Sequence, residues 1–133
     1  MLSITRGLAI LFGLALLPAH AGGCVYWYNG GIPGNADAYD CMKFDQAEKR
    51  NAAKFGLRLG TSFTAVKRQL VSRGWSIDRD WLENEGNDDP KRDLVCGTGH
   101  NAICSTAFKK NGEIVRLDFS DNNAGTPLIG VNK

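Results

Sequence analysis

The sequence has little histidine, little net charge and only one long hydrophobic run. Its 16 Lys and Arg nearly balance its 14 Asp and Glu, for a formal charge of +2. This balance argues against a dedicated nucleic-acid binder, in which a basic patch dominates the composition. The chain also lacks a phosphate-binding loop and other catalytic motifs. We therefore predict no catalytic residue, no cofactor and no metal.

The one long hydrophobic run lies at the N-terminus. Arg6 precedes ten largely apolar residues, 8–17, and Ala19-His20-Ala21 follows as a small-x-small cleavage site. A membrane span needs about 20 apolar residues, more than this run supplies. We therefore predict a signal peptide at 1–21 and a single small domain at 22–133. The mature chain is expected to have no integral membrane segment and to be periplasmic or secreted.

An alternative fate of the N-terminus follows from Ala21-Gly22-Gly23-Cys24, which resembles a lipoprotein box. In that case Cys24 would carry the lipid. However, Ala21 stands where such boxes usually have Leu, and lipidation would leave an odd number of cysteines. Lipoprotein anchoring at Cys24 therefore stays the less favoured reading.

The four cysteines all lie beyond the signal peptide: Cys24, Cys41, Cys96 and Cys104. An even number in a small exported domain indicates disulfide bonds. Of the three connectivities, we favour the pairs that are close in sequence, 24 with 41 and 96 with 104, because each flanks a Gly-rich loop. The alternative is a metal site made by Cys96, His100 and Cys104, whose spacing matches no common zinc pattern.

An aromatic run stands out in the loop-rich segment 22–40. Tyr26, Trp27 and Tyr28 are consecutive, and such side chains are common in surfaces that bind proteins or glycans. The alternative is a short edge strand whose alternate rings pack on the domain. Because neighbours in an extended segment point to opposite sides, we predict Trp27 and Tyr28 as binding residues.

The rest of the sequence predicts two helices followed by strands. The first helix runs from Asp40, a candidate N-cap, to Lys54, and the second is capped by Ser62 and ended by Gly74. Expected strands lie at 75–79, 103–109, 114–119 and 128–131, and an Asn111-Gly112 turn joins the second to the third as a hairpin. In the strand after the turn, residues 115, 117 and 119 are expected to face the core. We therefore predict an α+β fold, stabilised by disulfides, with two N-terminal helices packed on a three- to four-stranded antiparallel sheet.

One helix carries a resemblance to a known family. The pattern Gly60-x-Ser62-x3-Val66-x3-Leu70 resembles the start of the second helix in the SmpA/OmlA (BamE-like) family of small envelope lipoproteins. The element order is also similar to the repeat of the beta-lactamase inhibitor proteins. These resemblances imply a small secreted envelope protein of Gram-negative bacteria.

The functional hypothesis is a binding protein without catalytic activity: an inhibitor, an immunity protein or an envelope-assembly factor with a protein partner. The partner's identity and the oligomeric state do not follow from the sequence. The alternative is a small envelope enzyme that uses His100 with a carboxylate such as Asp93 or Asp118.

The signal-peptide assignment predicts that the exported protein begins at Gly22. Intact-mass spectrometry of the natively exported chain tests this directly. A diacylglyceryl adduct on Cys24 would contradict it.

Overall fold

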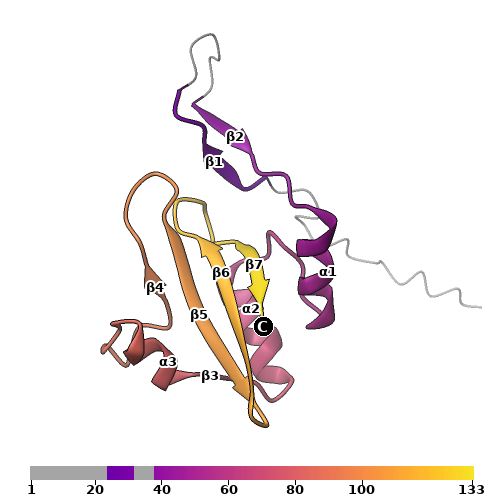
Figure 1. The fold of residues 1–133 in the computed structure, drawn as a ribbon, viewed down its shortest axis with the longest axis vertical. Coiled ribbons are helices and arrows are strands. Elements are labelled where there is room, and N and C mark those ends of the chain that lie inside the picture. The colour runs from indigo at the N-terminus through magenta and orange to yellow at the C-terminus, as the bar shows by residue number, and fades with distance from the viewer. Residues whose placement is uncertain (1–23, 32–37) are drawn as a thin grey trace, which may run out of the picture.

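The computed structural model describes residues 24–31 and 38–133; the predicted signal peptide lies outside these ranges. The described chain forms a mixed α+β fold with a five-stranded antiparallel sheet, a two-stranded sheet and three short helices (Figure 1). The helices are α1 (Gln46–Lys54), α2 (Phe63–Ser72) and α3 (Arg79–Asn84). The strands are β1 (Tyr26–Tyr28), β2 (Tyr39–Cys41), β3 (Ser76–Ile77), β4 (Val95–Cys96), β5 (Ile103–Lys110), β6 (Glu113–Ser120) and β7 (Leu128–Asn132).

The long hairpin of β5 and β6 organises the large sheet. All eight residues of β5 pair with β6, while the two-residue strands β3 and β4 share the other edge of β5. β7 pairs with β6. The predicted Asn111-Gly112 turn is confirmed, since both residues have positive φ angles, 51° and 81°.

Local capping signals place the first two helices. Asp45 caps α1 and forms a reciprocal capping box with Glu48. The predicted cap, Asp40, lies instead in β2, where it pairs with Trp27 of β1. The predicted cap of the second helix is confirmed, as the Ser62 hydroxyl accepts a hydrogen bond from the Ala65 N–H. Gly74, with φ 88°, follows its last turn.

The main core lies between one face of the large sheet and helices α1 and α2. Val66 and Leu70 of α2 are fully buried there with Phe108 and Leu117. The predicted inward residues 115, 117 and 119 are all buried. Outside this cluster, α3 lies against β5 beside the short strands β3 and β4 and buries Leu82 (Figure 1).

The prediction of two N-terminal helices on a three- to four-stranded sheet was wrong. The β1–β2 hairpin precedes the helices, so they are not N-terminal. The third helix was missed because its six residues are too few to show a helical period, although Asp78 caps it. The fifth strand was missed because β4 has only two residues, paired with β5.

The predicted disulfide bonds are confirmed. Cys24 is joined to Cys41 and Cys96 to Cys104, so the pairs close in sequence are the bonded ones. A lipid on Cys24 would be attached through the same sulfur atom that is bonded to Cys41 here. Disulfide bonds of this kind fit an exported protein in an oxidising compartment. Within the described ranges, no helix combines the length and the apolar character needed to cross a membrane.

The core assignment predicts opposite outcomes for two neighbours on α2. Leu70→Ala should lower the free energy of unfolding by about 2–5 kcal/mol, because Leu70 is fully buried. Val71→Ala, at a side chain that is 51% exposed, should change it by less than about 0.5 kcal/mol. Chemical denaturation measures both, and equal losses would contradict the placement of α2.

Candidate functional site

The β1–β2 hairpin displays aromatic side chains on one face. Tyr28 lies directly opposite Tyr39, and their ring centroids are 5.2 Å apart. Tyr26 shares that face because side chains alternate along a strand. Trp27, opposite Asp40, points to the other face and is half-buried. The predicted binding residues Trp27 and Tyr28 are therefore on opposite faces of the hairpin.

Two asparagine side chains attach the hairpin to the large sheet. The Asn101 carboxamide accepts from the N–H of Tyr28 at 2.7 Å and donates to its carbonyl at 2.9 Å. Asn123 does the same for Tyr26, at 2.8 and 2.9 Å. Each carboxamide thus takes the place of a neighbouring strand's peptide group. The outer backbone edge of β1 is satisfied at both positions, and Figure 1 shows the hairpin beyond one end of the large sheet.

His100 completes an aromatic cluster with the hairpin. Its ring stacks on Tyr28, with centroids 4.3 Å apart, and its Nδ1 lies 3.5 Å from the Tyr39 hydroxyl. Asn122 donates to the carbonyls of Gly99 and His100. The loop is closed behind these residues by the Cys96–Cys104 disulfide. The cluster is therefore held from both the hairpin and the sheet.

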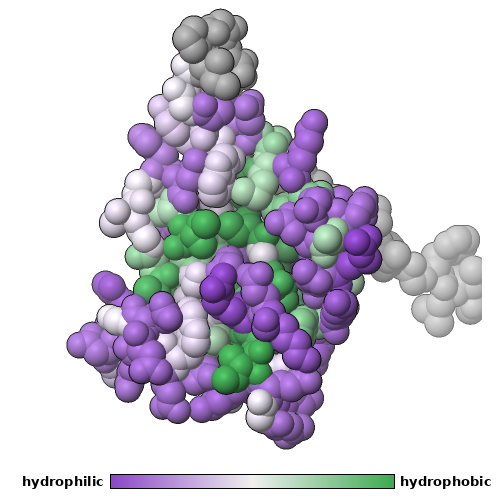
Figure 2. Space-filling view, viewed as in Figure 1, coloured by the Kyte–Doolittle hydropathy of each residue, from purple (hydrophilic) through white to green (hydrophobic). Residues whose placement is uncertain are grey.

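Two rings of this surface are open to solvent. Tyr26 is 56% exposed and Tyr39 44%, whereas Tyr28 is half-buried under His100. Figure 2 shows hydrophilic and intermediate residues at the hairpin end, with strongly hydrophobic ones gathered over the large sheet. The hairpin surface is therefore amphipathic, the character that tyrosine contributes to protein interfaces.

The two carboxylates considered as catalytic partners of His100 make other contacts. Asp93 binds Lys67 at 2.6 Å and Arg79 at 2.5 Å. Burial raises the pKa of the Asp93 carboxyl, but the hydrogen bonds and charges of Lys67 and Arg79 outweigh burial and hold that pKa below its ordinary value. Asp93 is thus a structural anion that links α2 to the start of α3.

Asp118 is engaged on the outer face of the large sheet. It accepts hydrogen bonds from Ser105 at 2.5 Å, Asn132 at 3.0 Å and Arg116 at 3.2 Å. The structure therefore does not bring His100 together with either proposed carboxylate in the described residues, and the enzyme alternative gains no support from this geometry.

The two cysteines considered as metal ligands are joined in a disulfide bond. In the ranges that the structure describes, Cys96, Cys104 and Asp121 form one group whose potential ligand atoms lie within 4.8 Å of one another. The two sulfur atoms are bonded to each other, so neither is a thiolate, the form that binds zinc. His100 lies outside this group.

Three residues of the site were missed by sequence reasoning. Tyr39 carried no signal beyond its aromatic type, because its pairing with Tyr28 depends on the hairpin register. Asn101 and Asn123 lie 73 and 97 residues from the strand positions that they bind. Asparagine is common in loops, so only the three-dimensional structure shows this role.

Comparison with protein-family models, characterised proteins and solved structures found no match to this chain.

Proposed function

We propose that the chain is a periplasmic binding protein of the Gram-negative envelope, without catalytic activity, and that the exposed rings of the β1–β2 hairpin contact a protein partner. An inhibitor, an immunity protein and an envelope-assembly factor all belong to this class. The resemblance of residues 60–70 to SmpA/OmlA proteins supports the envelope assignment.

The observation that carries the proposal is the fixed presentation of exposed tyrosines. A two-stranded hairpin alone is marginally stable. Here a disulfide closes it, and four hydrogen bonds from two asparagines hold its outer edge. Tyrosines presented on such a support lose little entropy when a partner binds, and this makes them effective contact residues.

The proposed contact surface extends the residues predicted from the sequence. Tyr26 and Tyr39 form its exposed centre. Tyr28 contacts the Tyr39 ring on the same face and stacks on His100. Trp27, on the other face of the hairpin, is proposed to contact a part of the partner that extends around the hairpin. A protein partner suits this arrangement because hot spots combine tyrosine and tryptophan with a polar rim.

The proposal predicts that Tyr26→Ala with Tyr39→Ala weakens partner binding by on the order of tenfold or more while the fold is retained. The backbone hydrogen bonds to Asn123 do not depend on the Tyr26 side chain. The matched control is Val71→Ala with Ile114→Ala, since each of these side chains is 51% exposed and neither belongs to the β1–β2 hairpin.

Each protein would serve as bait in a periplasmic extract of the source organism, and calorimetry would then measure the affinity of any stoichiometric partner. The proposal is supported if the wild type and the control retain the same partner and the tyrosine variant does not. Equal retention by all three, with unchanged melting temperatures, contradicts it.

A further inference from the structure

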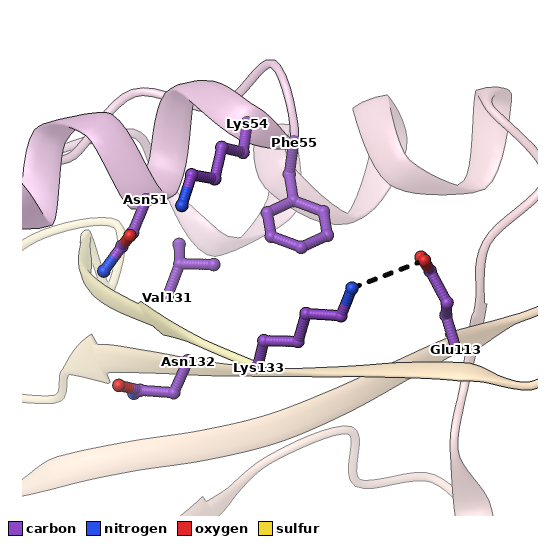
Figure 3. Close-up of a pocket in the computed structure, with 7 residues that line it drawn as sticks. All are labelled: Asn51, Lys54, Phe55, Glu113, Val131, Asn132 and Lys133. Carbon is purple, nitrogen blue, oxygen red and sulfur yellow. Dashed lines mark hydrogen bonds and ion pairs between the residues drawn. The ribbon is translucent and has the colours of Figure 1, made fainter.

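A cavity lies away from the β1–β2 hairpin, between the end of α1 and strand β7. Its volume is about 480 Å³. Figure 3 shows Asn51, Lys54 and Phe55 entering from the helix, with Val131 and Lys133 on the side of the strand. Such a volume is within the usual range for small-molecule sites. Nothing in the proposed function uses this cavity.

The apolar part of the cavity is held in place from the core. The Phe55 ring packs edge-to-face on Trp75, with centroids 5.8 Å apart. The Phe55 carbonyl accepts a hydrogen bond from Arg73 at 2.6 Å. Val131, in the central sheet cluster, is only 4% exposed. A ligand would therefore meet a preformed apolar surface.

The charged part of the cavity contains an ammonium group without a counter-ion. Lys54 makes no ion pair or side-chain hydrogen bond in the described chain, and Figure 3 shows its side chain extending toward Asn51 and Val131, while Lys133 extends toward Glu113. Arg73 binds the carbonyls of Phe55 and Gly56, just beyond the last turn of α1. Lys54 lies in that last turn, where the helix dipole favours a cation but supplies no ion-pair partner.

A second ammonium group can be released at low cost. Lys133 is paired with Glu113 at 3.5 Å, and their side chains are 69% and 53% exposed. An exposed pair of this kind contributes only about 0–1 kcal/mol. A carboxylate that also reaches Lys54 can therefore replace Glu113 as the partner of Lys133.

We propose that this cavity binds a carboxylate attached to a short apolar group. The carboxylate lies between Lys54 and Lys133, and the apolar group packs on Phe55 and Val131. Asn51, which lines the same cavity, supplies a carboxamide donor at its edge. A free short-chain acid and the C-terminal residue of a peptide share this chemistry.

The proposal predicts a defined response in ¹H–¹⁵N spectra of the protein. Hexanoate should shift the amide signals of Lys54, Phe55 and Val131. Hexanamide lacks the charge and acetate lacks the apolar chain, so both should bind more weakly. Lys54→Ala should weaken hexanoate binding by about threefold or more. Lys91→Ala, an exposed lysine in the polar loop after α3, should leave the affinity unchanged.

A peptide titration separates the two sources of the carboxylate. Acetyl-Gly-Gly-Val with a free C-terminus should shift the same signals, and its C-terminal amide should not. Tighter binding of the peptide than of hexanoate would identify a peptide end as the ligand, and the reverse would identify a free acid. Equal binding of hexanoate and hexanamide, an unchanged affinity in Lys54→Ala, or no shift at these amides would overturn the proposal.

Discussion

The outer backbone edge of β1 is hydrogen-bonded by two side chains, and the position of the hairpin depends on them. Asn101 and Asn123 each offer one donor and one acceptor to a single residue of β1. An ordinary neighbouring strand would also cover that edge, but it would continue the sheet. Side-chain carboxamides satisfy the edge without adding a further strand. The same four bonds therefore attach the hairpin by its backbone, and they use neither the Tyr26 nor the Tyr39 side chain, both of which are exposed.

The two disulfide bonds support this arrangement at separate points. The Cys24–Cys41 bond closes the hairpin, and the Cys96–Cys104 bond joins β4 to β5 below the His100 loop. A loop of the length between Cys24 and Cys41 contributes about 3 kcal/mol when it is closed. That is a large contribution in a small domain, where the core alone supplies limited stability. The covalent links thus hold both partners of the aromatic cluster, and the asparagines bring them together.

Local signals in the sequence predicted the parts of the fold that depend on neighbouring residues. The Ser62 cap, the Asn111-Gly112 turn and the inward face of β6 all follow from short patterns. The cap of α1 was predicted at Asp40, five residues before the actual cap, Asp45, because the pairing of Asp40 with β1 is not visible in the sequence. At the site, the aromatic run was visible in the sequence. Its partners were not, because their contacts join residues 73 and 97 positions apart.

Amide hydrogen exchange at Tyr26 and Tyr28 tests the attachment of the hairpin most directly. In Asn101→Ala with Asn123→Ala, both amides lose their acceptors, so their exchange should accelerate by on the order of tenfold. Amides of β5 and β6 should keep their protection. Asn84→Ala, at the exposed end of α3, should change none of these rates. Unchanged exchange at Tyr26 and Tyr28 in the double variant would contradict the account.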